Sequence, residues 1–316
     1  MREKIETLRA QLDRQIIGQD RLIERLLVGL LSSGHLLIEG MPGLAKTTAV
    51  NALANATHLA FRRIQFTPDM IPGDITGTDI FLPREGRFEF SPGPLFNEII
   101  LADEINRAPP KVQSALLEAM QERQITVGDT TRALPDVFMV IATQNPIEHE
   151  GTYALPEAQM DRFLMKVTVD YPSEDEELRI LQTEEERSAA PTDVEQDIDA
   201  DDIRGVQQLV RGIYMDPMLE RYIVTLVSAT RNPTRWDPEL ANWLDWGASP
   251  RATLALARAA RALAWLRGRE FVEPDDIISL ATDIMGHRIG LSFAGRSQRV
   301  GPAAIIDRLI EHIPIP

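Results

Sequence analysis

The chain has 316 residues, with 33 basic and 48 acidic side chains and no cysteine. The absence of cysteine excludes disulfides, thiolate zinc sites, iron–sulfur clusters and a cysteine nucleophile. No apolar run approaches the roughly 18 residues that a membrane-spanning helix requires. The N-terminus carries charges of both signs with no apolar core behind it, which is not the pattern of a secretory signal, so we expect a cytoplasmic protein.

The net charge of −15 is concentrated in one segment. Residues 173–203 hold 13 acidic residues and two arginines, so this segment alone carries −11 of the −15. An acidic run of this kind is typical of a solvated helix or linker. It provides no basic stripe, so the composition does not favour a nucleic-acid ligand.

The first two-thirds of the chain alternates short apolar runs with helical patterns, which predicts an α/β fold with a parallel sheet covered by helices. The apolar runs predict strands at 36–38, 61–66, 99–102, 137–142 and 163–169. Helical patterns occupy 21–31, 47–57 and 112–121. Two further segments, 81–96 and 124–138, combine apolar residues with glycine or proline turns and predict hairpins.

The character of the sequence changes after Tyr171-Pro172. Beyond the acidic run the pattern is helical to the end, with predicted helices at 203–212, 217–230, 251–267 and 274–285. We therefore expect an α/β domain over residues 1–172, an acidic helix or linker over 173–200 and an all-helical domain over 201–316.

A candidate phosphate-binding loop directly follows the first expected strand and opens a helix. Its small residues would expose successive backbone N–H groups to phosphate oxygens, and the helix start adds a positive end. Lys46 would reach the β- and γ-phosphates, and the Thr47 hydroxyl would hold Mg²⁺. Ala45 stands where the common pattern has glycine, and a plain Gly/Pro turn is the alternative. The residues expected at the nucleotide are Gly40, Met41, Pro42, Gly43, Leu44, Ala45, Lys46, Thr47 and Thr48.

Two acidic residues end the apolar run 99–102. A nucleotide hydrolase needs a carboxylate at the end of a neighbouring strand to hold Mg²⁺ through water, which fits Asp103, and a base for the attacking water, which fits Glu104. Asn145 follows the run 137–142 and would hydrogen-bond this water or the γ-phosphate. Taken alone, the acids fit a solvated strand end and Asn145-Pro146 fits an ordinary turn. Together with the loop they predict an ATP and Mg²⁺ site.

Several longer strings extend beyond these motifs. They are Gln65-Phe66-Thr67-Pro68-Asp69, Asp74-Ile75-Thr76-Gly77, Leu101-Ala102-Asp103-Glu104-Ile105-Asn106-Arg107, Thr143-Gln144-Asn145-Pro146, the run 155–163 and Gly247-Ala248-Ser249-Pro250-Arg251-Ala252. In these strings the sequence resembles the MoxR group of AAA+ ATPases, from Ile17 to about Gly290. Alanine before the lysine is common in this group, so Ala45 departs from the generic loop but not from the family.

The resemblance implies a fold and an activity. It implies a P-loop AAA+ αβα sandwich with a mostly parallel five-stranded sheet, followed by an all-helical lid domain, with the two hairpins as insertions. It also implies ring assembly, usually as a hexamer, with ATP and Mg²⁺ bound between neighbouring subunits. Members work as chaperone-like ATPases that assist maturation of, or metal insertion into, a client complex, and their partners commonly carry a von Willebrand factor A domain.

The resemblance further implies roles for individual residues. Asn145 would be the first sensor and Arg251 the second sensor. Arg162 would be an arginine finger that reaches the neighbouring subunit's γ-phosphate, with Asp161 orienting its guanidinium. The adenine would be lined by Ile17 and Gly18.

The arginine assignments have plainer alternatives. Arg162 could form a surface ion pair with Asp161. Arg251 could be an ordinary first-turn residue, although a cation at a helix start opposes the helix dipole. Arg107 is a second candidate for the contact with the neighbouring subunit.

Two other functions stay open at this level. One is a nucleotide-gated scaffold that binds ATP but hydrolyses little. The other is a nucleic-acid remodelling ring, which would need basic hairpins. The two hairpin segments hold only three arginines against four acidic residues, so nucleic acid is the less favoured partner.

Overall fold

The computed structural model describes residues 1–41, 43–44, 46–145, 152–189 and 198–316, with the side chains of 184–189 left aside. The chain forms two compact units. The first comprises Met1–Leu155 and Val167–Gly205, and the second comprises Pro156–Lys166 and Val206–Pro316. Within the described residues, no helix combines the length and the apolar character needed to cross a membrane.

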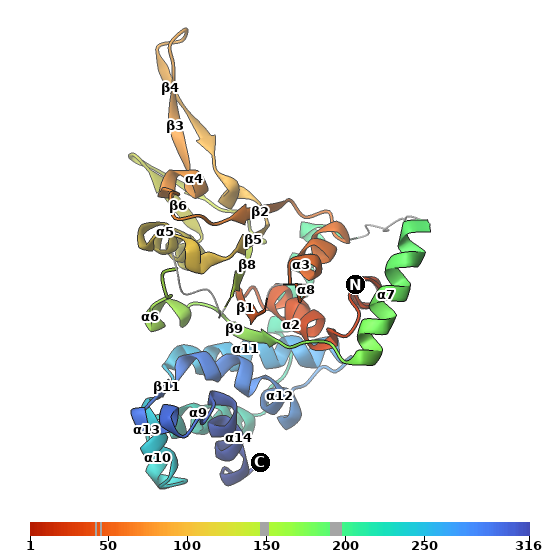
Figure 1. Cartoon of the computed structure of the whole chain (residues 1–316), viewed down its shortest axis with the longest axis vertical. Coiled ribbons are helices and arrows are strands. Elements are labelled where there is room, and N and C mark those ends of the chain that lie inside the picture. Colours follow the sequence, from red (N-terminus) through yellow and green to blue (C-terminus); the bar gives the residue numbers. More distant parts are fainter. Residues whose placement is uncertain (42, 45, 146–151, 190–197) are drawn as a thin grey trace. The chain divides into compact units, whose positions relative to one another are not determined.

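A five-stranded sheet forms the centre of the first unit (Figure 1). The strand order is β2 (Phe61–Gln65), β5 (Ile99–Asp103), β8 (Met139–Gln144), β1 (Leu36–Gly40) and β9 (Met165–Val169). β2 pairs with β5, β5 with β8 and β8 with β1, all in parallel. The three middle strands are almost entirely buried, which explains their continuous apolar sequences. The predicted α/β fold with five strands is confirmed.

Most helices of this unit bury an apolar face, whereas the described side chains of α7 are exposed or half-buried. Ile5, Leu8 and Leu12 are the buried residues of the first helix, and the second is buried along most of its length. The short turns α4, η1 and η2 lie between the longer elements. The helical elements of this part of the chain are α1 (Arg2–Gln15), α2 (Asp20–Leu31), α3 (Lys46–Asn55), α4 (Pro72–Thr76), η1 (Pro94–Phe96), η2 (Ile105–Arg107), α5 (Pro110–Glu122), α7 (Glu174–Ala189) and α8 (Ala200–Arg211).

Both predicted hairpins are present. β3 (Gly77–Leu82) pairs with β4 (Arg87–Pro92), and β6 (Gln124–Val127) pairs with β7 (Thr130–Ala133), each antiparallel. The first begins four residues before the predicted segment, and its last predicted residues form η1 instead. It extends well away from the sheet (Figure 1), where Phe81 and Phe88 pack on each other while both stay exposed. Arg132 joins the hairpins by stacking 3.8 Å from the centroid of the Phe90 ring.

The second unit is helical, as predicted, apart from one small ribbon. Its principal helices are α9 (Pro217–Arg231), α11 (Pro250–Leu266), α12 (Pro274–Met285) and α14 (Pro302–His312). α11 buries a stripe of alanines and leucines, and the alanines allow a close approach of neighbouring helices. The shorter elements are α6 (Glu157–Met160), η3 (Pro233–Arg235), α10 (Leu240–Trp243), β10 (Leu244–Trp246), η4 (Gly286–Arg288), β11 (Gly290–Leu291) and α13 (Phe293–Ser297). The antiparallel β10–β11 ribbon was not predicted, because two or three residues carry no usable periodicity.

Candidate nucleotide site

The sheet order brings the sequence motifs of the first unit together. β1 and β5 both flank β8 and run parallel to it, so the carboxyl ends of all three strands lie at one edge. The phosphate loop follows β1, Asp103 ends β5 and is followed by Glu104, and Asn145 follows β8. Ligands of open α/β sheets bind outside the carboxyl ends of the strands.

Two glycines of the loop are required for different reasons. A Cβ on Gly40 would lie 2.7 Å from the carbonyl oxygen of Val169 in β9, so the close approach of the two strands excludes a side chain. Gly43 has φ +85° and open space around it, so here the left-handed backbone itself favours glycine. The described part of the loop therefore has the backbone freedom that a phosphate cradle needs.

Lys46 begins α3, and its ammonium donates hydrogen bonds to the carbonyl oxygens of Gly40 and, at 3.4 Å, of Gln144. These contacts place the cation between the ends of β1 and β8. Thr47 and Thr48 follow in the first turn of α3, and Leu44 is buried. Met41 is half-buried, and the predicted loop residues Pro42 and Ala45 lie outside the described residues.

The Asp103 carboxylate is held from two sides. Its Oδ1 accepts a 2.6 Å hydrogen bond from the Thr143 hydroxyl in β8. Its Oδ2 accepts hydrogen bonds from Arg63 in β2, at 2.6 Å from Nη2 and 3.1 Å from Nε. Asp103 is 8% exposed, so these donors compensate for the loss of water around a charged group.

Glu104 has an uncommon backbone conformation, with φ 56° and ψ 52°. A non-glycine residue in this left-handed region costs of order 1–3 kcal/mol and is enriched at functional sites. Its N–H donates to the Thr143 hydroxyl at 3.0 Å, and its Oε2 accepts from Gln65 at 2.9 Å and Arg107 at 3.1 Å. One hydroxyl therefore fixes the spacing of both acids, while two side chains hold the Glu104 carboxylate.

The donors present fit a nucleotide with Mg²⁺. Mg²⁺ takes oxygen ligands and is commonly held by one or two protein oxygens together with substrate phosphates and water. Within the described residues no group of three or more His, Asp or Glu forms a dedicated metal cage. The Thr47 hydroxyl and the Asp103 carboxylate supply the one or two protein oxygen ligands that Mg²⁺ takes beside the phosphates of a nucleotide.

The remaining predicted residues of the first unit lie in two places. Asn145 is buried immediately after β8. Ile17 and Gly18 form the turn between α1 and α2, where Gly18 lies against the Glu176 side chain of α7. Their roles at the γ-phosphate and the adenine stay predictions.

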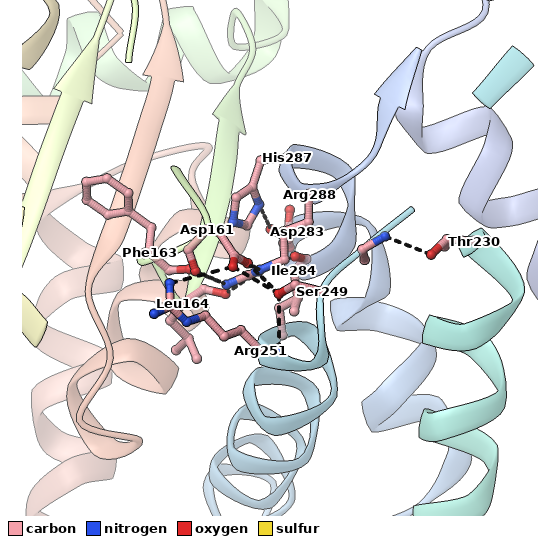
Figure 2. A network of polar contacts seen from close by, with 11 residues as sticks. Asp161, Phe163, Leu164, Thr230, Ser249, Arg251, Asp283, Ile284, His287 and Arg288 are labelled. Atoms are coloured by element: carbon pink, nitrogen blue, oxygen red, sulfur yellow. Dashed lines mark hydrogen bonds and ion pairs between the residues drawn. The ribbon is translucent and has the colours of Figure 1, made fainter. Parts of the chain in front are cut away.

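The other predicted residues, Arg162 and Arg251, belong to the second unit. Figure 2 shows Arg251 near Asp161. The Asp161 carboxylate accepts hydrogen bonds from Ser249, at 2.9 and 3.1 Å, and from Arg288, at 2.8 Å. The Arg251 guanidinium lies 3.7 Å from Asp161, which offsets the unfavourable position of a cation in the first turn of α11. Arg162, next in the chain, is half-buried in the turn before β9.

The unit boundary differs from the sequence interpretation at this point. The pattern assigned all of 1–172 to the α/β domain, whereas residues 156–166 group with the helical unit. The physical reason is the set of hydrogen bonds that Arg288 makes to Asp161, Phe163 and Leu164, a contact 124 or more residues apart in the sequence. Arg162 and Arg251 thus belong to one compact unit.

Five residues with structural roles here were given no role from the sequence. Gln65 and Thr143 lie within strings of the resemblance, but no pattern indicated their hydrogen bonds to the acids. Arg63 and Gln65 are two residues apart on the exposed side of β2. This spacing is the only signal that could have placed both side chains on one face of the strand. Ser249 also lies within one of these strings, directly before a proline at a helix start, whereas Arg288 had no local signal. The five are Arg63, Gln65, Thr143, Ser249 and Arg288.

Comparison with known proteins gives two family matches. The family described as "ATPase family associated with various cellular activities (AAA)" matches residues 35–165, and the family described as "AAA lid domain" matches residues 241–309. These matches cover the phosphate loop with its acids and most of the helical unit.

Relatives extend the likeness over nearly the whole chain. The chain is 46% identical to Chaperone MoxR1 of Mycobacterium tuberculosis, over 97% of this chain and 81% of that protein. It is 35% identical to Protein MoxR of Paracoccus denitrificans, over 97% of this chain and 95% of that protein. A crystal structure from Cytophaga hutchinsonii superposes with a TM-score of 0.92 at 42% identity, covering all of this chain and 96% of its own. The chain therefore belongs to the MoxR family of AAA+ ATPases.

Proposed function

We propose that this protein binds ATP with Mg²⁺ and hydrolyses it to ADP and phosphate at sites between neighbouring subunits of a ring. The observation that carries the proposal is the edge of the sheet where the phosphate loop, Lys46, Asp103 and Glu104 come together around Thr143. The bound nucleotide would supply a phosphoryl group that Mg²⁺ polarises.

Each residue has a distinct part in this proposal. The loop N–H groups and Lys46 bind the phosphates, while Thr47 and Asp103 hold Mg²⁺ directly or through water. Glu104 orients and deprotonates the attacking water. Its carboxylate must then exchange its bonds with Gln65 and Arg107 for one with water, and both partners lie close enough to hold it again after turnover.

Further residues complete the proposed site. Asn145 hydrogen-bonds the γ-phosphate or the water. Arg162 acts as the arginine finger, contributing positive charge to the neighbouring subunit's nucleotide, and Arg251 couples the helical unit to the nucleotide of its own subunit. We assign the finger to Arg162 because the resemblance places it there, and Arg107, which binds Glu104 within its own chain, stays the second candidate.

The biological role follows from the family and not from the site. One relative is named a chaperone. We propose a hexameric, chaperone-like motor that remodels or matures a client protein complex, with metal insertion as one form of that work and a von Willebrand factor A domain protein as the expected partner.

The test is steady-state ATPase activity measured against protein concentration for four samples. These are the wild type, Glu104→Gln, Arg162→Ala and an equimolar mixture of the two variants. Specific activity should rise with concentration, both variants should be inactive, and the mixture should regain turnover. In the mixture a subunit with an intact Glu104 receives an intact finger from its neighbour.

Two outcomes would contradict the proposal. Activity that is independent of concentration, with Arg162→Ala fully active, would refute the assignment of the finger. The same series with Arg107→Ala would then identify the acting arginine. If Glu104→Gln leaves client maturation intact, the protein is a nucleotide-gated scaffold and not a motor.

A further inference from the structure

Arg288 is a buried cation in the second unit. It ends η4 (Gly286–Arg288), and its side chain is 2% exposed. Burial lowers the pKa of its guanidinium to about 10, opposed by the bond to Asp161, so the group remains charged at neutral pH. A buried charge is stable only when it is paired and fully hydrogen-bonded, so its contacts carry structural information.

Those contacts converge on the turn that holds Arg162 (Figure 2). Nε donates to the Asp161 carboxylate at 2.8 Å, and Nη2 donates to the Asp161 carbonyl oxygen at 3.2 Å. The carbonyl oxygens of Phe163 and, at 3.1 Å, of Leu164 accept from the same guanidinium. Arg288 also donates to the carbonyl oxygen of Ile284 in its own helical segment.

The guanidinium therefore binds the backbone on both sides of Arg162. Its planar fork has five N–H donors in fixed directions, so acceptors at Asp161, Phe163 and Leu164 can be satisfied together only by one path of the intervening chain. A lysine offers a point charge without this geometry. The position of Arg162 relative to α12 and η4 is set by these bonds.

The same turn is joined to the start of α11. Ser249, the N-cap of α11, donates its hydroxyl to Asp161, and the guanidinium of Arg251 lies 3.7 Å from that carboxylate. Asp161 is thus shared between Arg288 and the first turn of α11. The turn with Arg162, the first turn of α11 with Arg251 and the η4 segment form one hydrogen-bonded body.

We infer that Arg288 is a positioning residue that fixes Arg162 to the helical unit, so that the finger offered to the neighbouring subunit moves together with Arg251. This inference rests on the proposed function, in which Arg162 acts across the subunit boundary and Arg251 senses the subunit's own nucleotide. Its consequence is a mechanical link: a displacement of the helical unit in one subunit displaces the catalytic arginine of the next site.

The test compares Arg288→Gln with Arg269→Gln. Arg269 makes an equivalent pair in the same unit, donating at 2.6 and 2.7 Å to Asp276, which is fully buried in the first turn of α12. Both substitutions remove an arginine from a carboxylate, which is 18% exposed in Asp161 and fully buried in Asp276, but only Arg288→Gln releases the turn around Arg162. Each variant is assayed for kcat, for binding of a fluorescent ATP analogue and for kcat in an equimolar mixture with Glu104→Gln.

We expect Arg288→Gln to lower kcat by about 10²-fold, the effect of a misplacement of about 1 Å, with the Kd for the analogue nearly unchanged. The mixture with Glu104→Gln should regain turnover, because the Arg288→Gln subunit then receives an intact finger. Arg269→Gln should keep a near-normal kcat. If Arg288→Gln does not yield folded protein, Arg288→Lys, which keeps the charge but not the fork, should show a smaller loss with the same rescue.

The inference is overturned if Arg288→Gln and Arg288→Lys keep full kcat. It is also overturned if their loss persists in the mixture while that of Arg162→Ala is rescued, since Arg288 would then serve only its own subunit. Failure of the proposed function is distinguishable, because in that case Arg162→Ala is itself active, or is not rescued by Glu104→Gln.

Discussion

The two units hold their charged site residues in opposite ways. In the first unit, the charged partners of the acids at the end of β5 reach solvent, with Arg63 50% and Arg107 41% exposed. In the second unit, Asp161 is held by Arg288, which is 2% exposed and also binds backbone carbonyls. Exposed pairs contribute little and exchange easily, whereas breaking a buried pair is costly. The first arrangement suits groups that must change partners during turnover, and the second suits groups that must move as one body.

The largest effect is expected in the first unit, where the partners of Glu104 must exchange. Glu104→Gln removes the proposed base but keeps a side chain of the same shape, so kcat should fall about 10²–10⁴-fold while ATP binding is retained. Rapid-mix phosphate release and equilibrium binding of a fluorescent ATP analogue measure the two quantities. Gln65→Ala is the control, because it frees the Glu104 carboxylate without removing it and should retain most of the activity. If Gln65→Ala lost as much activity as Glu104→Gln, the Gln65–Glu104 hydrogen bond would have to stay intact during turnover, and the two partners would not exchange.

The rigid side of the comparison should show in local stability. Asp161→Asn leaves Arg288 buried with a neutral partner, and breaking a buried pair costs about 3–5 kcal/mol. We expect faster hydrogen exchange of the amides in 161–166 and 286–289, with the amides of β5 unaffected. Asp201→Asn breaks an exposed pair with Arg204 and serves as the control, with an expected cost below about 1 kcal/mol. Similar costs for the two substitutions would remove the distinction between the units.

A smaller effect is expected at the residue that links the two acids. Thr143→Val keeps the shape of the side chain but removes the hydroxyl that accepts from the Glu104 N–H and donates to Asp103. A buried N–H or carboxylate oxygen left without its hydrogen bond lowers the free energy of unfolding by about 1–3 kcal/mol. Urea denaturation of the first unit, followed by hydrogen exchange of β5 and β8, measures the change, and Thr143→Ser should recover most of it. No difference between valine and serine would show that the hydroxyl does not hold the acids.

The smallest effect concerns pH and the second unit. Burial lowers the pKa of His287 well below its usual value, and the nearby Arg288 and Lys166 lower it further. The unfolded chain then binds the proton more readily, so the contribution of His287 is complete above about pH 6.5 and declines by about 1.4 kcal/mol per pH unit below it.

Unfolding free energies between pH 7.5 and 5.5 should therefore fall less steeply in His287→Gln than in the wild type. His312→Gln removes an exposed histidine of α14 and is the control. An unchanged slope in His287→Gln would mean that the buried imidazole does not drive the pH dependence.

The sequence alone determined the fold class and predicted most of the residues proposed for the first unit's site. The phosphate loop, Asp103 and Glu104 follow apolar strands, and parallel strands bring their carboxyl ends to one edge, so periodicity and spacing were sufficient. The longer strings identified the family. The positions of helices and strands could also be predicted, because burial of one face imposes a period on the apolar residues of the sequence.

Only the tertiary structure decided which side chains hold these residues. Arg63 and Gln65 meet the acids because β2 lies next to β5, a pairing between strands about 40 residues apart. Thr143 meets both acids because β8 pairs with β5 on its other side. Arg288 lies more than 120 residues from the turn it holds, and an isolated arginine after a short helix carries no local signal of burial. Partners that meet through folding are set by long-range contacts, which a pattern of neighbouring residues does not record.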